Sequence, residues 1–109
     1  KTFFASEGLF LLHCSGQGPL ILSSYGAIHE MWLDVDERYT VDTGHLVAFG
    51  EGMGFDVRAA GGLKSTLFSG EGLVVELTGP GRVLVQTRSA DALLAWLTPQ
   101  VQRRLPKNQ

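Results

Sequence analysis

The sequence predicts an all-β fold with internal repeats and a short C-terminal helix, and three observations lead to this prediction. The 14 glycines recur every several positions between apolar runs, which is typical of short strands joined by tight turns. The stretch Thr66–Arg88 contains a turn, a strand, a Gly-Pro-Gly reversal and a second strand, and Thr2–Ser24 resembles it. From Ser89 onward, apolar residues recur at helical spacing.

The two similar stretches predict one supersecondary unit used twice. We divide the chain into a β-domain over residues 1–88, made of a unit at 1–64 and an incomplete unit at 65–88, and a helical segment at 89–109. Because Lys1 falls inside a unit, we expect the chain to be the C-terminal part of a longer protein. The matching positions are Thr2, Phe4, Glu7, Gly8, Leu9, Gly16 and Gly18 in the first copy and Thr66, Phe68, Glu71, Gly72, Leu73, Gly79 and Gly81 in the second.

Each copy is predicted to form a β-hairpin. In the second copy, a loop at Gly79-Pro80-Gly81 places Leu77 opposite Val83 on one face of the pair, since strand side chains alternate. In the first copy, the hairpin closes near Gly16 and Gln17 or through a longer loop, and Leu20–Leu22 forms its second strand.

Four further strands are predicted between the two copies. The first of them, Ile28–Asp34, alternates, with Met31, Leu33 and Val35 on one face and Trp32 as the exception on the other. Polar and glycine-rich turns separate the strands, and Asp42 is placed to bond the backbone ahead of it. The remaining three predicted strands are Tyr39–Val41, His45–Phe49 and Phe55–Ala59.

The C-terminal segment is predicted to begin as a helix at Ala90, with Ser89 as its N-cap. Its apolar stripe consists of Leu93, Leu94, Trp96 and Leu97. Thr98-Pro99 predicts a stop, followed by a second short helix over Pro99–Leu105, because proline suits the first position of a helix and disfavours its interior. We expect this segment to cover an open end or edge of the β-structure.

Composition restricts the class of protein. A chain of 109 residues with 44% hydrophobic and 18% charged residues fits one folded domain. Its net charge of −2 supplies no general attraction to nucleic acids. The single cysteine, Cys14, excludes an intrachain disulfide, and its apolar setting predicts a buried side chain. No apolar run reaches the roughly 20 residues that span a bilayer.

Few residues suggest a binding or catalytic site. His13, His29 and His45 lie in different predicted strands or turns, which favours separate structural or surface roles over a metal site. Tyr25 and Trp32 offer aromatic faces for a ligand or an interface, and Lys64 lies in a Gly-Gly-Leu-Lys-Ser segment that only partly matches a phosphate loop. We assign no catalytic, cofactor-binding or metal-ligating residue.

Several motifs together resemble the altered-inheritance-of-mitochondria protein twenty-four family. The resemblance implies a fold similar to the tryptophan RNA-binding attenuation protein, with short strands wound into a double-stranded β-helix or compact β-sandwich. It implies no catalytic residues, a mitochondrial location in fungi and a cytoplasmic one in prokaryotes. The motifs are Ser24–Ile28, Tyr39–Phe49, Gly61–Phe68, Gly70–Leu73, Gly79–Gly81, Gln86–Ser89 and Trp96–Leu97.

These patterns favour a non-enzymatic β-domain that acts by self-assembly or binding, as a homo-oligomer without a cofactor. A first alternative is a small-ligand or RNA-binding protein that uses Tyr25, Trp32 or Lys64. A second is a cupin-like metalloenzyme that uses the histidines. We expect a cytoplasmic location, or a mitochondrial one if the chain is fungal.

Overall fold

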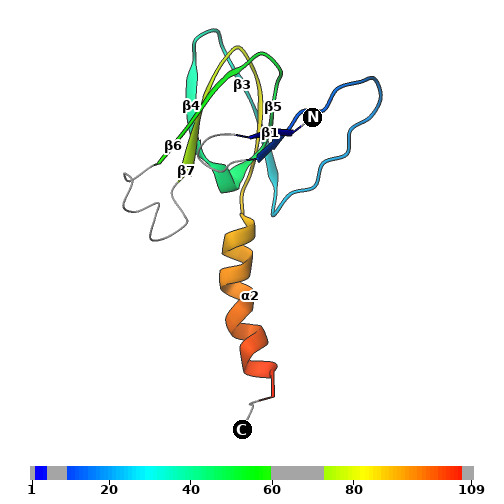
Figure 1. The fold of residues 1–109 in the computed structure, drawn as a ribbon, viewed down its shortest axis with the longest axis vertical. Helices are drawn as coiled ribbons and strands as arrows, with labels where there is room; N and C mark the ends of the chain where they lie inside the picture. Colours follow the sequence, from blue (N-terminus) through cyan, green and yellow to red (C-terminus); the bar gives the residue numbers. More distant parts are fainter. Residues whose placement is uncertain (1, 5–9, 60–72, 107–109) are drawn as a thin grey trace.

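The β-structure consists of two three-stranded antiparallel sheets and a separate pair of strands (Figure 1). The computed structural model describes residues 2–4, 10–59 and 73–106. One sheet has the order β3 (Ile28–Leu33), β8 (Gly81–Gln86), β5 (Leu46–Phe49), and the other has the order β4 (Arg38–Asp42), β7 (Leu73–Thr78), β6 (Gly54–Ala59). The separate pair is β1 (Thr2–Phe4) and β2 (Phe10–Leu12).

The core lies between the two three-stranded sheets. Val75 and Leu77 of β7 and Val83 of β8 are fully buried, and burial of such a side chain contributes about 1.5–3 kcal/mol. The rest of the core cluster consists of Leu33, Val41, Met53 and Val57. Because both sheets contribute to this cluster, they form two layers, and the predicted all-β fold is confirmed. The double-stranded β-helix and the likeness to the attenuation protein stay predictions.

The predicted hairpin of the second copy is wrong, because β7 and β8 belong to different sheets. Strand β7 pairs with β4 and β6, whereas β8 pairs with β3 and β5. The connection between them, which contains a cis Gly79–Pro80 bond, is held by the turn after β3. The Gly79 amide donates to the Glu37 carbonyl oxygen at 2.8 Å, and the Asp36 amide donates to the Gly79 carbonyl oxygen at 3.3 Å.

The first copy also differs from its predicted hairpin. Strand β2 pairs with β1, and residues 13–27 contain no strand. Ile21, in the predicted second strand, is 92% exposed, and Cys14 is exposed rather than buried. The apolar composition of Leu20–Leu22 suggested a strand, but among the described residues no strand pairs with them. The duplication and its boundary at residues 64 and 65 stay predictions, since residues 60–72 lie outside the described part of the chain.

The four middle strands are confirmed as β3, β4, β5 and β6, with ends that differ by up to one residue. In β3, Leu33 is buried and Met31 packs against the core, as predicted. Trp32, the exception to the alternation, is exposed. Val35 is exposed, contrary to the prediction, because the strand ends at Leu33 and the alternation ends with it. The Gly44 amide donates to Asp42 Oδ1 at 2.8 Å, which confirms the predicted Asp turn before the short helix η1 (Thr43–His45).

The C-terminal segment forms one continuous helix, α2 (Ala90–Arg104). Ser89 caps it as predicted, since its Oγ accepts from the Ala92 amide at 3.1 Å. The predicted break at Pro99 is wrong. A proline inside a helix removes one hydrogen bond and distorts the backbone locally, and here the helix continues through it.

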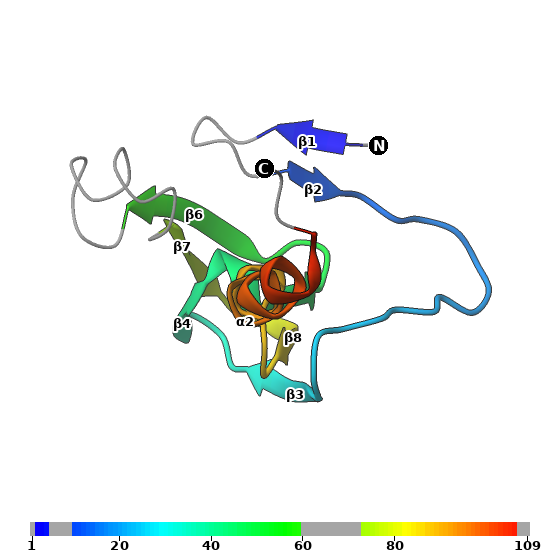
Figure 2. The same ribbon diagram turned by 90° about the horizontal axis from the view of Figure 1, so that it is seen from below.

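Helix α2 does not cover the β-structure, which contradicts the predicted capping role. None of its residues is buried, and it projects from the sheets along the long axis of the molecule (Figure 1). The molecule measures 60 × 38 × 24 Å along its principal axes. Seen along the helix, α2 lies near the middle of the β-structure (Figure 2). Among the described residues, none of the helices has both the length and the apolar content to cross a bilayer.

Candidate functional site

Trp32 is the most exposed aromatic side chain in the described part of the β-structure, at 68%, and two charged side chains hold it. Its Nε1 donates to Glu30 Oε1 at 3.0 Å. Arg82, directly opposite Trp32 in the β3–β8 register, donates to Glu30 Oε2 at 2.9 Å. The Arg82 guanidinium carbon lies 5.9 Å from the indole centroid, within the range of a cation–π contact. The cluster presents an oriented aromatic face to solvent.

Tyr25 lies beside a shallow, open depression of about 510 Å³ at the other end of β3 and β8. Gln86 organises this region, because its Oε1 accepts from the Tyr25 amide at 2.9 Å and its Nε2 donates to the Gly44 carbonyl oxygen at 2.8 Å. The depression is lined by Ser23, Ser24, Tyr25, Leu46, Val47 and Gln86. These bonds engage the Gln86 side chain within the protein.

The sequence-predicted site residues do not form one site. Tyr25 lies near the end of the sheet where Ile28 pairs with Gln86. The pair Trp32–Arg82 is four residues further along β3 and β8, which corresponds to about 13 Å. Lys64 lies outside the described residues. Tyr25, which precedes β3, and Trp32 therefore do not share one site.

The three histidines also lie apart. His45 Nδ1 bonds the Gln86 carbonyl oxygen at 2.8 Å, which requires the tautomer with a proton on Nδ1. His29 sits in β3 opposite Val85, and His13 Nε2 lies 4.0 Å from Glu51 Oε1. In the part of the chain that the structure describes, no three His, Cys, Asp or Glu side chains gather as a metal site would require.

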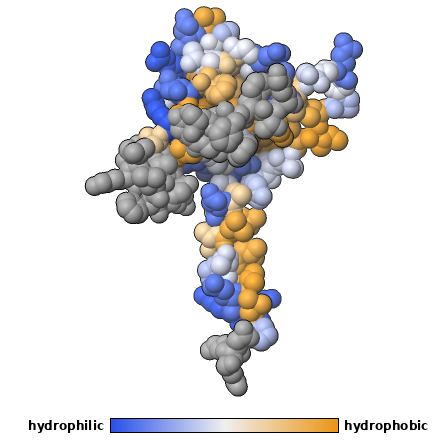
Figure 3. All heavy atoms as spheres, in the orientation of Figure 1, coloured by the Kyte–Doolittle hydropathy of each residue, from blue (hydrophilic) through white to orange (hydrophobic). Residues whose placement is uncertain are grey.

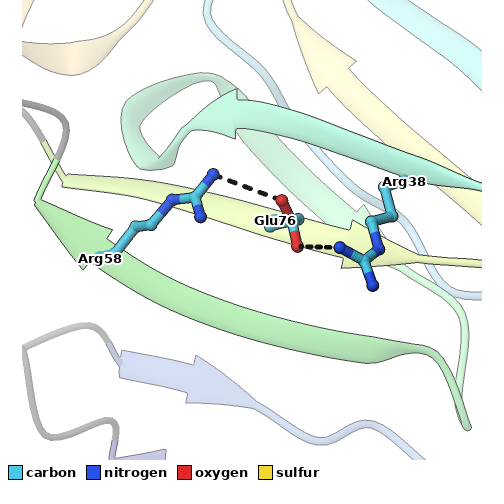
Figure 4. A network of polar contacts seen from close by, with 3 residues as sticks. All are labelled: Arg38, Arg58 and Glu76. Atoms are coloured by element: carbon cyan, nitrogen blue, oxygen red, sulfur yellow. Dashed lines mark hydrogen bonds and ion pairs between the residues drawn. The ribbon is translucent and has the colours of Figure 1, made fainter.

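The outer face of the second sheet carries a charge cluster that the sequence analysis missed. Glu76 in β7 lies between Arg58 of β6 and Arg38 of β4, as Figure 4 shows, with nitrogen–oxygen distances of 3.3 and 3.9 Å. The three residues tie the three strands of this sheet together. Glu76 is opposite Thr40 in β4 and Asp56 in β6, and each arginine is two positions from that partner on its own strand. Only the strand order could therefore have revealed the cluster.

Helix α2 carries a continuous exposed apolar surface (Figure 3). Its exposed side chains recur every three or four residues and lie on one face, and Figure 3 shows this face as a stripe along the helix. Trp96 lies beside the stripe. We define the α2 stripe as the exposed side chains Leu93, Leu94, Leu97, Val101 and Leu105. The first half of the stripe follows from the spacing in the sequence, whereas Val101 and Leu105 join it only because the helix continues through Pro99.

The ends of α2 carry opposite charges. Asp91 lies in the first turn, and Arg103 and Arg104 lie in the last turn, where each charge suits the helix dipole. Within the described residues, none of the three takes part in an ion pair. The helix therefore offers both an uncovered apolar stripe and unused charges at its two ends.

Comparisons with known proteins match most of this chain. A family described as mitochondrial biogenesis AIM24 matches residues 1–88, which end just before α2. An uncharacterised protein of Streptococcus pyogenes serotype M6 is 30% identical over 88 residues, which cover 80% of this chain and 35% of that protein. A crystal structure of a Streptococcus pyogenes protein has a TM-score of 0.60 and 25% identity and covers 71% of this chain and 35% of its own. The chain thus spans about a third of the length of these relatives.

Proposed function

This chain belongs to the mitochondrial biogenesis AIM24 family, and we propose that it is a non-enzymatic domain that self-assembles through the α2 stripe. The observation that carries the proposal is a 15-residue helix with no buried residue and an aliphatic stripe along its length. Monomeric proteins rarely leave a large continuous apolar patch uncovered, and such patches mark interaction surfaces. A second copy of the chain supplies a matching stripe.

The energetics favour association of this helix. Each Å² of apolar surface removed from water contributes about 25 cal/mol. An isolated helix of about 15 residues is only marginally stable in water and gains most of its stability from packing. A partner for the α2 stripe therefore both buries apolar surface and stabilises the helix.

The charged groups of the β-structure support a non-catalytic role. Glu30 pairs with Arg82 and Glu76 with Arg58, and the His45 imidazole binds a backbone carbonyl. These groups are engaged in holding strands together. We therefore assign them to the structure and place the function on α2.

Sedimentation velocity over a wide range of protein concentration tests the proposal. We expect dimers to accumulate as the concentration rises, and Leu94→Glu to shift the population to monomers because it places a charge in the stripe. Ala95→Glu is the matched control, since Ala95 lies off the stripe and should leave assembly unchanged. A wild-type chain that stays monomeric up to about 0.2 mM, well above the affinity of weak specific complexes, contradicts the proposal.

A second candidate function is the binding of a planar ligand on Trp32. The specific observation in its favour is the exposed indole held in place by Glu30, with Arg82 beside it, since an exposed aromatic face and an arginine stack on bases and other planar groups. Fluorescence titration of a Trp96→Phe chain with nucleotides and RNA oligomers tests it, because Trp32 is then the single tryptophan. Unchanged emission across the panel removes this candidate.

The proposal also includes a cytoplasmic location, or a mitochondrial one if the chain is fungal. The compartment expected from the family supports it, and the lone exposed Cys14 is compatible with a reducing environment. Fractionation of cells that carry a tagged chain tests it, and recovery of the chain outside the cell would contradict it.

A further inference from the structure

We infer that a second copy of this chain packs antiparallel on helix α2, so that the first turn of each copy, with Asp91, lies beside the last turn of the other, with Arg103 and Arg104. The inference rests on the proposed self-assembly and adds the direction and the contacts of the pairing. A two-fold axis near the middle of the helix generates the arrangement, and the same stripe then serves both copies.

The charges at the ends of α2 favour the antiparallel direction. Asp91 lies in the first turn, and Arg103 and Arg104 lie in the last. An antiparallel pair brings the first turn of one copy beside the last turn of the other, which places opposite charges together at both ends. A parallel pair brings like charges together at both ends, which is unfavourable. The two helix dipoles also oppose each other only in the antiparallel pair.

The position of α2 beneath the β-structure favours the same direction. Packed helices lie about 8–10 Å apart, whereas the molecule measures 38 and 24 Å across its long axis. Figure 2 shows the helix near the middle of the β-structure rather than at its rim. A parallel pair at this spacing forces the two β-structures into the same space. An antiparallel pair puts them at opposite ends of the helices.

Pro99 lies on the face of α2 opposite the stripe and does not interfere with packing there. It lies two residues after Leu97 and two before Val101, so at 100° per residue it is on the opposite face of the helix from the stripe. The backbone distortion at the proline therefore faces solvent. The seam of one copy consists of Leu94, Leu97 and Val101, and the two-fold axis places Leu94 against Val101 of the second copy.

The size of the seam predicts a weak dimer. Helix α2 has 15 residues, which correspond to a length of about 22 Å. Two such helices packed along their length give an interface at or below the small end of stable complexes, which is about 1,200 Å². We expect a dissociation constant on the order of micromolar, and a dimer that dissociates on dilution.

Disulfide cross-linking measures the direction of the pair. In a Cys14→Ser background, a chain with Leu94→Cys is mixed with a longer tagged chain with Val101→Cys and oxidised at high concentration. Antiparallel packing yields mainly the mixed disulfide, whereas parallel packing yields the two like-with-like disulfides. Dimers that form only like-with-like disulfides overturn the inference and leave the proposed function standing. A chain that sediments as a monomer overturns both.

Exchange of the charges provides the second measurement. Asp91→Arg alone and Arg104→Asp alone should each weaken dimerisation about tenfold, because two symmetric pairs become repulsive. The double variant should recover most of the loss. A double variant as weak as either single variant, or a chain that stays monomeric in solution and floats with phosphatidylglycerol vesicles, overturns the inference.

Discussion

Leu77 and Val83 are six positions apart, fully buried, and contributed to one core by opposite sheets. The connection between them crosses from one layer to the other. Each side chain therefore contacts a layer that its own strand does not belong to, and the two together join the sheets.

Leu77→Ala should destabilise the chain by about 2–5 kcal/mol, because it leaves a cavity between the layers. Urea denaturation followed by circular dichroism at 215 nm, near the usual β-sheet band, measures the change in the free energy of unfolding. Leu94→Ala is the control, since Leu94 lies on the exposed stripe and should change that free energy by less than about 0.5 kcal/mol at concentrations where the chain is monomeric. Equal effects of the two substitutions would contradict this core.

Gly79→Ala should destabilise the chain by about 1–3 kcal/mol, the usual cost of overpacking. A Cβ at this position meets the Asp34 carbonyl oxygen and the Leu33 Cβ, with the latter 2.8 Å away. Gly50→Ala is the matched control, because its nearest neighbour atom is 3.7 Å away. Thermal unfolding measures the melting temperatures of both variants. Equal melting temperatures would show that the connection between β7 and β8 is less tightly packed than described.

Ser89→Ala should cost about 1 kcal/mol of helix stability, since it removes the oxygen that accepts from the Ala92 amide. Ser89→Asp keeps an accepting oxygen and should preserve the helix. Ellipticity at 222 nm measures the fraction of helix in each chain. Because α2 has no buried residue, the loss should appear as fraying of the helix while the β-structure keeps its unfolding midpoint.

Pro99→Ala should increase the helicity of α2 and strengthen self-assembly. A proline in a helix interior costs about 3 kcal/mol relative to alanine, and a helix that is already formed pays less to dimerise. Thr98→Ala is the control, with a gain below about 0.7 kcal/mol. Sedimentation and ellipticity report the two effects. If Pro99→Ala and the control behave alike, the helix does not continue through residue 99.

Glu76→Gln should destabilise the chain more than Glu30→Gln, although both effects should stay within about 1 kcal/mol. The Glu76 carboxylate is only 21% exposed and meets two arginines, whereas that of Glu30 is 45% exposed and meets one. Urea denaturation at low and high salt measures both. Salt should reduce the Glu30 effect more, because exposed pairs are screened more strongly.

Local features of this protein followed from local sequence. The alternation in Ile28–Leu33 identified β3 and its inward side chains, the Asp42 turn formed the bond that its position predicted, and Ser89 capped the helix. Each of these depends on residues within a few positions of one another. The resemblance to the family also depended on short motifs, and the family comparison confirmed it over residues 1–88.

The candidate surfaces could be predicted only in part. Trp32 was identified as an aromatic candidate for a ligand or an interface, but its partner Arg82 is 50 positions away in sequence and meets it only through the β3–β8 register. The first half of the α2 stripe was visible from its spacing. Its second half depended on whether the helix continues through Pro99. The low helix propensity of proline predicted a break there, and that prediction was wrong.

The sequence by itself determined that the chain forms short strands followed by a capped helix, because alternation, turn chemistry and capping are short-range effects. Only the tertiary structure decided that β7 and β8 enter different sheets, that Cys14 is exposed and that α2 has no buried residue. These outcomes depend on which distant strand pairs with which and on the surface left uncovered afterwards. Pairing energies between strands are similar for many apolar partners, so the packing of the whole core selects among them.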